Sequence, residues 1–364
     1  MKVVKSDEQG LRAAAETLLQ GGVAVIPTDT VYGLAAHPDF PDAVERLYTI
    51  KARDARKPIA LLAADGESAA KFLGGMSTVA ERVAARDWPG ALTLVLPVCT
   101  EGGETPRFEG LRVPDHAWTR ALLHACGGVL RVTSANLSGA RPATDAEAAL
   151  RDIGLSADLV VDDGVSRGGT ASTVAKISGG EVTVLREGPV GFLTLASGSP
   201  RRAKILREHG VAFTVLKTDA PEVSYPDDPE RTVRENALAK GAAAARARVL
   251  SADTIVWLDG KIYGKPRDLD EARAFLRALS GRTHAVFTGV AYDGDARVVR
   301  SDVTFRALTD ADIETYVARV HPTDRAGAYD IDTCGELVVA GYTGTYENIM
   351  GLPVEPLKDW GIVK

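Results

Sequence analysis

The sequence contains few cysteines and no long apolar run. Its three cysteines, Cys99, Cys126 and Cys334, show no spacing that indicates disulfide pairing, and so small a number is typical of a reducing compartment. No hydrophobic segment reaches the roughly 20 residues that a membrane-spanning helix needs. No signal-peptide pattern and no low-complexity tail are visible. We therefore expect a cytosolic protein that does not associate with a membrane.

The chain also lacks a strong excess of charge. Residues 1–190 carry 20 basic and 24 acidic side chains, and the remainder carries 23 and 25, so the net charges of −4 and −2 add to the −6 of the whole chain. Because neither half is basic, sequence-independent binding of nucleic acid is excluded as the main function, although a local basic groove is not. The 364 residues, 45% hydrophobic and 25% charged, fit two soluble globular domains.

The boundary between the two domains is predicted within LREGPVGFLTLASGSPRR, Leu185–Arg202. A strand ends near Arg186 and a Gly-Pro break follows. A new strand over 192–196 then leads through a turn of small residues into a helix that begins at Pro200. Two arginines in the first turn of that helix make an anion site. We expect one domain over 1–190 and another over 191–364, both of the α/β class with sites at strand ends.

Local signals predict the helices of the first domain. Ser6 with Gln9 forms a capping-box pattern at the start of one helix, and Thr144 with Glu147 forms another. Asp42 is predicted to cap a helix that continues to the basic segment beginning at Lys51. A short buried strand is predicted over Val23–Ile26.

Three polar segments follow predicted strands or helices of the first domain. The loop PTDTVYGL (27–34) is rich in hydroxyls, and TSANLSG (133–139) presents alternating small polar groups. Between them, four cations within seven residues suit a triphosphate: Lys51, Arg53, Arg56 and Lys57. Taken singly, each segment also fits a plain polar turn or a solvated helix end.

Together these segments resemble the YrdC family of threonylcarbamoyl-AMP synthases. PTDTVYGL, KARDARKP, LRVP, TSANLSG, STV and LREG occur in the family order across residues 5–190. The resemblance implies a twisted open α/β sheet and a reaction of L-threonine, bicarbonate and ATP that gives threonylcarbamoyl-AMP and pyrophosphate. This reaction leads toward threonylcarbamoyladenosine in tRNA, so tRNA-modification proteins are implied partners. By the same resemblance, threonine is implied to contact Thr28, Tyr32 and Arg112, and the ATP phosphates are implied to contact Lys51, Arg53 and Lys57. Ser134 and Asn136 are implied to line the junction between the amino acid and the nucleotide. Ser172 and Arg186 are implied to close over the nucleotide.

The second domain places charged residues where they are costly without a ligand. Arg201 and Arg202 oppose the dipole of their helix. Asp253 is predicted at the start of an apolar strand, where a carboxylate needs a metal or a cation. A long helix is predicted over 228–249 with Lys240 on one face, where a lysine is most often a surface residue. Strands over 284–292 and 298–307 have hairpin spacing, and Thr309 with Asp312 predicts a further capping box.

These segments resemble the Maf family of nucleoside triphosphate pyrophosphatases. LASGSPRR, ADTIV, GKPRD, LSGRTH, TGV, DRAGAY and NIMGLP fall in the family order across residues 193–357. The resemblance implies an ITPase-like α/β domain with a central cleft, which hydrolyses a nucleoside triphosphate with the help of a divalent metal, Mg or Mn. Asp253 is implied as the catalytic carboxylate, and Glu222 and Asp253 as metal ligands. The residues implied around the triphosphate are Ser197, Arg201, Arg202, Lys240, Thr254 and Lys265.

One position departs from the family pattern. Members that act on dTTP and UTP usually read Gly-Ile-Gln after AGAY, whereas this chain has Asp330, Ile331 and Asp332. An ionised Asp332 offers only acceptors, so it would repel a uracil carbonyl and suit the amino group of cytosine or the N–H groups of guanine. Asp332 could instead cap a turn. On resemblance alone, dTTP and UTP are the expected substrates.

The sequence therefore predicts a bifunctional enzyme that acts on ATP and on a second nucleoside triphosphate. In the alternative interpretation, one domain is a non-catalytic RNA-binding or cell-division regulatory module. The net charges speak against RNA binding, and the presence of Asp253, Lys240 and Lys265 speaks against an inactive second domain.

Overall fold

The computed structural model describes residues 1–98, 107–153, 156–178 and 181–363. The chain forms two compact units, Met1–Gly191 and Phe192–Lys364. Within the described residues, no helix is long and apolar enough to cross a membrane. Cys99 lies outside the described residues, and the described cysteines Cys126 and Cys334 are free thiols.

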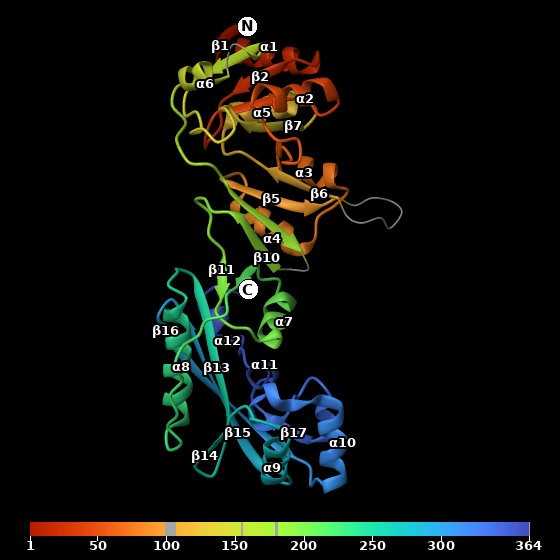
Figure 1. Ribbon diagram of the computed structural model, residues 1–364, viewed down its shortest axis with the longest axis vertical. Helices are drawn as coiled ribbons and strands as arrows, with labels where there is room; N and C mark the ends of the chain where they lie inside the picture. The colour runs from red at the N-terminus through yellow and green to blue at the C-terminus, as the bar shows by residue number, and fades with distance from the viewer. Residues whose placement is uncertain (99–106, 154–155, 179–180, 364) are drawn as a thin grey trace. The chain divides into compact units, whose positions relative to one another are not determined.

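The first unit contains a mixed sheet with both parallel and antiparallel strand pairs (Figure 1). From one edge to the other the strands are β1 (Lys2–Lys5), β8 (Leu159–Asp162), β2 (Val23–Ile26), β3 (Gly33–Ala36), β7 (Val129–Ser134), β4 (Leu61–Ala63), β6 (Phe108–Arg112), β5 (Leu92–Pro97), β9 (Thr173–Ser178) and β10 (Glu181–Arg186). The predicted strand over Val23–Ile26 is confirmed, and every residue in it is buried.

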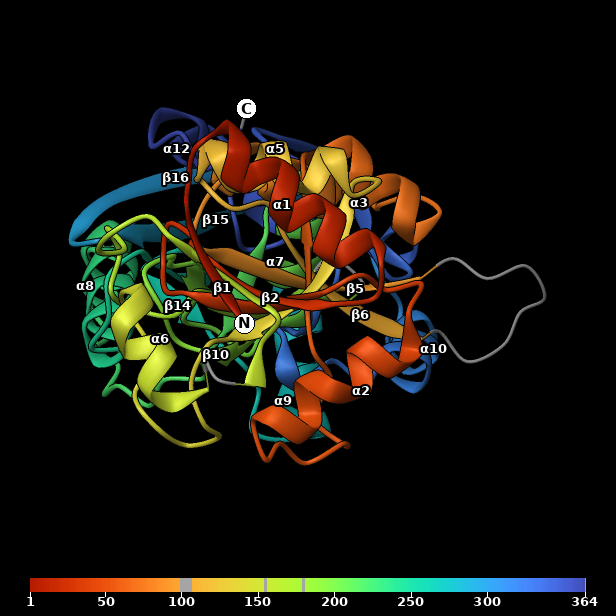
Figure 2. The same cartoon turned by 90° about the horizontal axis from the view of Figure 1, so that it is seen from above.

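Helices cover both faces of this sheet. On one face, α1 (Glu8–Leu19) and α5 (Ala117–Ala125) pack side by side, as Figure 2 shows. On the other face, α2 (Pro41–Ile50) and α6 (Ala146–Asp152) pack on the opposite side chains of β2 and β3. The remaining helices are α3 (Gly66–Leu73) and α4 (Thr78–Asp87).

Three predicted helix starts were wrong, two by one residue and one by two residues. Asp7, not Ser6, caps α1 by accepting from the Gly10 backbone at 2.8 Å, because the Ser6 hydroxyl bonds to Asp163 instead. Asp145 replaces Thr144 as the cap of α6. Helix α2 begins at Pro41 with no side-chain cap, and it ends at Ile50 before the basic segment.

The second unit contains a second sheet. Its strands, in order, are β12 (Phe213–Val215), β11 (Leu193–Leu195), β13 (Val249–Leu258), β15 (Thr283–Tyr292), β16 (Asp295–Phe305) and β17 (Val339–Thr343), and β14 (Lys261–Tyr263) pairs with the far end of β13. The hairpin of β15 and β16 and the capping box of Thr309 with Asp312 are confirmed, although β16 begins three residues earlier than predicted.

The helices of the second unit pack against this sheet. They are α7 (Pro200–Glu208), α8 (Pro229–Ala243), α9 (Leu269–Leu279), α10 (Asp310–Val320), α11 (Tyr346–Ile349) and α12 (Glu355–Asp359). Helix α8 runs along the strands β13 and β15, and in Figure 1 α9 and α10 lie together at the far end of the sheet.

The predicted helix over 228–249 is too long. Helix α8 ends at Ala243 because Ala245 and Arg248 adopt φ values of +49° and +59°, which a right-handed helix does not allow. Strand β13 therefore starts at Val249, so Asp253 lies within the strand and not at its start. This places the carboxylate directly beneath α8.

Helix α8 approaches β15 closely at one glycine. A Cβ atom on Gly289 would lie 2.2 Å from the Val233 carbonyl oxygen and 2.9 Å from the Arg234 backbone nitrogen. Both atoms are backbone, so neither can move aside cheaply. Gly289 thus sets the depth at which α8, with Asn236 and Lys240, lies on the sheet.

We predict that Gly289→Ala destabilises the second unit, because α8 must shift outward to make room for the methyl group. Overpacking of this kind costs about 1–3 kcal/mol, measurable as a lower free energy of unfolding in urea. Gly341→Ala in β17 is the control, since a Cβ there meets nothing within 4 Å. Equal stability of the two variants would contradict the close approach.

Candidate active sites

The PTDTVYGL loop of the first unit is closed by its own hydrogen bonds. Thr28 Oγ1 donates to the Val31 carbonyl at 2.6 Å and accepts from the backbone nitrogens of Thr30 and Val31. The Tyr32 hydroxyl donates to the Gly164 carbonyl at 2.8 Å and accepts from the Asp163 backbone at 2.9 Å. Burial raises the pKa of Tyr32 to about 12. Thr28 and Tyr32 therefore shape the loop through buried hydroxyls.

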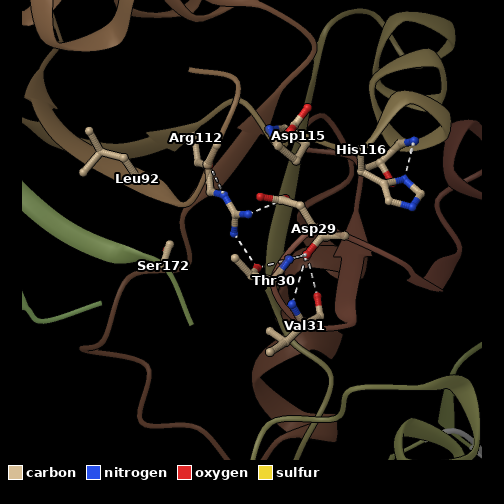
Figure 3. Close-up of polar contacts among 12 residues, drawn as sticks. Asp29, Thr30, Val31, Leu92, Arg112, Asp115, His116 and Ser172 are labelled. Carbon is tan, nitrogen blue, oxygen red and sulfur yellow. Dashed lines mark hydrogen bonds and ion pairs between the residues drawn. The ribbon is translucent and has the colours of Figure 1, made fainter. Parts of the chain in front are cut away.

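Arg112, at the end of β6, points into this loop (Figure 3). Its Nε donates to the Gly90 carbonyl at 2.9 Å, its Nη1 to Thr30 Oγ1 at 2.7 Å, and its Nη2 to the Asp29 carboxylate. Burial lowers the pKa of Arg112, and the charge of Asp29 opposes that shift. Asp29 and Arg112 thus present a carboxylate and a guanidinium side by side. Asp29 was not among the residues that the resemblance implied at the threonine site.

Lys51 is buried and bonds to the TSANLSG loop. Its ammonium donates to the backbone carbonyls of Ser134 and Asn136 and lies 3.5 Å from Asn136 Oδ1. Burial, and then the nearby Arg53, lower the pKa of Lys51 to about 8. The Asn136 amide in turn donates to two carbonyls of the same loop. The structure thus brings Lys51, Ser134 and Asn136 together, with the Lys51 ammonium turned toward loop carbonyls.

Arg53 and Arg186 gather near Arg112. Arg186 donates to the Ser172 carbonyl at 2.8 and 3.0 Å and to Ser172 Oγ at 3.1 Å. Partial burial, followed by the charges of Arg112 and Arg53, lowers the pKa of Arg186. Arg53 bonds only to carbonyls of its own turn, those of Lys57 and Pro58, among the described contacts. A group of three neighbouring guanidiniums forms a region suited to a polyanion.

The second unit contains a cavity of about 370 Å³, within the usual size range of small-molecule sites. Its wall includes the predicted residues Ser197, Arg201, Arg202, Glu222, Lys240, Thr254 and Lys265. Residues 196–202, 217–218, 324–326, 329–331 and 349–351 also contribute to the wall. The wall of the cavity is therefore formed by residues from the beginning, the middle and the end of the second unit's sequence.

Asp253, Lys240 and Glu222 form the charged cluster at this cavity. The Lys240 ammonium lies 2.6 Å from Asp253 Oδ1 and 2.8 Å from Glu222 Oε1. The Asn236 amide donates to the other Asp253 oxygen at 3.0 Å. Two carboxylates that face one cation match the donors Mg²⁺ takes from a protein when phosphates complete its shell. Across the described residues, no group of three or more His, Cys, Asp or Glu side chains is arranged to hold a metal.

The two adjacent arginines of α7 have different environments. Arg202 donates to the Gly351 carbonyl at 2.8 Å, to Ser197 Oγ at 3.0 Å and to Thr254 Oγ1 at 3.2 Å. Burial lowers the pKa of Arg202 to about 10, and Asp253 opposes the shift. Arg201 lies 3.5 Å from Asp330 and 3.9 Å from Asp324. Arg202 therefore joins three segments of the wall, while the charge of Arg201 is shared with carboxylates.

The structure places Asp332 beside the cavity and not in its wall. Its two carboxylate oxygens accept from Lys204 at 2.6 Å and from the Tyr346 hydroxyl at 2.8 Å. Asp330 lines the cavity instead and is paired with Arg325 at 2.8 Å. Neither Asp330 nor Arg325 was among the residues predicted to bind the nucleotide, and the lining residue Lys217 belongs to no motif found in the sequence.

Comparison with known proteins divides the chain at the same place. The model of the family described as "Maf-like protein" matches residues 192–360, and that of the Sua5/YciO/YrdC family, described as "Telomere recombination", matches residues 16–188. A dTTP/UTP pyrophosphatase of Myxococcus xanthus is 43% identical over 171 residues, and one of Escherichia coli K12 is 44% identical over 172. These alignments cover 45% and 44% of this chain and 87% of each relative.

Solved structures also resemble this chain. The crystal structure of P. abyssi Sua5 complexed with L-threonine aligns with 58% of this chain at 27% identity and a TM-score of 0.48. The chain spans 62% of the length of that protein. The crystal structure of E. coli YciO aligns with 52% of this chain and 96% of its own, at 26% identity and a TM-score of 0.47.

The two family matches and the curated relatives agree with the resemblances seen in the sequence. The chain joins two units: its second unit belongs to the Maf family, and its first unit matches the model of the Sua5/YciO/YrdC family over residues 16–188.

Proposed function

We propose that the second unit hydrolyses a nucleoside triphosphate, dTTP or UTP, to the monophosphate and pyrophosphate. The observation that carries this proposal is the Lys240 ammonium held between Glu222 and Asp253 at a cavity lined by cations. The relatives that are dTTP/UTP pyrophosphatases support the choice of substrate.

In this reaction a water oxygen bonds to the α-phosphorus while the bond from that phosphorus to the bridging oxygen breaks. Asp253 accepts the proton of the water, and Lys240 and Asn236 orient its two oxygens. A divalent metal held by Glu222 and Asp253, Mg or Mn, supplies charge neutralisation at the phosphates when it is bound. Lys265 on the cavity wall would bind the departing pyrophosphate.

For the first unit, we propose synthesis of threonylcarbamoyl-AMP from L-threonine, bicarbonate and ATP. Threonine and bicarbonate combine to the carbamate with loss of water, and a carbamate oxygen attacks the α-phosphorus of ATP as pyrophosphate leaves. No protein nucleophile is needed, so the chain supplies position and charge. Transfer of the product to tRNA requires other proteins of the modification pathway.

The proposed roles follow the observed contacts. The pair of Asp29 and Arg112 is complementary to an amino acid, with Arg112 facing the threonine carboxylate. Arg53, Lys57 and Arg186 would hold the phosphates, and Ser172 is fixed beside them by Arg186. Lys51 would act by holding Ser134 and Asn136 in place, because its own N–H groups are taken by that loop.

We predict that Asp253→Asn lowers nucleotide hydrolysis by about 10²–10⁴-fold, the usual contribution of a general base. Threonine-dependent release of pyrophosphate from ATP should be nearly unchanged, because the first unit has its own residues. Asp259→Asn, on an exposed turn residue that pairs with Arg282, is the control. If both activities fall together in a folded variant, the proposal of two sites is wrong.

We predict that Arg112→Lys raises the threonine KM at least tenfold, about 1.4 kcal/mol of binding. The planar guanidinium of arginine can bond to Asp29 and Thr30 and face a substrate carboxylate at the same time. Lysine lacks this planar group. Arg107→Lys makes the same change at an exposed arginine. An unchanged threonine dependence would remove Arg112 from the site.

We predict that Asp332→Gln leaves the base preference of the second unit unchanged. Lys204 and Tyr346 occupy both oxygens of Asp332, and the residue is absent from the cavity wall. Rates with all eight common nucleoside and deoxynucleoside triphosphates would be compared in the two proteins. A shift of the variant toward dTTP and UTP would show instead that Asp332 reads the base.

A further inference from the structure

The cavity of the second unit contains more cations than its sequence motifs indicate. Of the six basic side chains in its wall, Arg201 and Arg325 pair with Asp330, and Lys240 pairs with Glu222 and Asp253. Arg202 bonds to neutral oxygens and is buried among them. The other two basic side chains are Lys217 and Lys265. In the described part of the chain, their ammonium groups have no ion pair and no hydrogen bond.

Lys217 reaches the cavity from the loop after β12. Its side chain lies across Gly198, where a Cβ atom would be 2.8 Å from Lys217 Cε and 3.2 Å from Cδ. Gly198 belongs to the turn that leads into α7, so the Lys217 ammonium is carried to the N-terminal end of that helix. A cation is unfavourable beside a helix N-terminus unless an anion joins it.

A second observation at the same place indicates a ligand. The hydroxyl oxygen of Thr218, the next residue, is buried and has no hydrogen-bond partner in the described structure, and Thr218 also lines the cavity. A buried hydroxyl without a partner is costly. A phosphate bound beside the Lys217 ammonium and the Thr218 hydroxyl would offset the cost of both groups.

We propose that Lys217 binds the phosphate chain of the nucleoside triphosphate in the second unit, together with Lys265. The inference rests on the proposed hydrolysis and adds a phosphate-binding residue to it. Because Arg201 and Lys240 are paired with carboxylates, the two unpaired lysines and Arg202 provide the net positive charge that a triphosphate requires. Lys217 contacts phosphate oxygens only, so its contribution is the same for every nucleobase.

The test compares Lys217→Met with Lys217→Arg and with Lys358→Met. Lys358 is an exposed lysine of α12 outside the cavity wall, so its variant removes the same charge from the same unit. We expect Lys217→Met to raise KM about tenfold for dTTP, UTP and a purine nucleotide alike, with kcat little changed. The dependence of kcat/KM on salt concentration should become less steep. Lys217→Arg should restore most of the affinity.

Two outcomes would overturn the inference. A Lys217→Met variant that matches Lys358→Met in KM and in salt dependence places the ammonium outside the phosphate site. A loss confined to kcat, with unchanged KM, excludes a binding role. If the native protein hydrolyses no triphosphate, the proposed function fails separately. Calorimetric titration with inorganic pyrophosphate still tests Lys217 in that case. The inference requires that the Lys217→Met variant binds pyrophosphate at least tenfold more weakly than the Lys358→Met variant.

Discussion

Charges in a protein interior must be compensated, and both candidate sites are built around this constraint. In the first unit the buried guanidinium of Arg112 is balanced by Asp29, and the buried ammonium of Lys51 by carbonyl oxygens. In the second, Asp253 lies within a buried strand and is balanced by Lys240 and Asn236 of α8. The depth of α8, set by the contact of Gly289 with the Val233 carbonyl, determines whether that compensation is available.

The two units share a chemical task under our proposal. Each cleaves the bond between the α- and β-phosphates and releases pyrophosphate, and each surrounds the phosphates with arginine and lysine. The arrangements differ in their acid–base groups. The second unit positions a carboxylate for a water molecule, whereas the first places a guanidinium and a carboxylate for an amino acid whose carbamate is itself the nucleophile.

Local features were predictable from the sequence, and distant pairings were not. The strand Val23–Ile26 and the capping box of Thr309 with Asp312 depend on neighbouring residues and are confirmed. The caps of α1 and α6 were misplaced by one residue because two adjacent polar residues compete for the same role. Asp29 and Arg112 are 83 positions apart, so no spacing rule could pair them. Asp332 likewise acquired its partners Lys204 and Tyr346 only through the fold.

Arg202 has a consequence for the order in which the second unit is made. Its guanidinium joins Ser197, near the start of the unit, to Thr254 in the middle and to Gly351 near the end. During synthesis the first two partners emerge from the ribosome long before the third. Until Gly351 has been added, Arg202 lacks one acceptor and the cavity lacks part of its wall. The cavity of the second unit therefore has its full wall only after residue 351 has been translated, so a shorter chain lacks this preformed cavity.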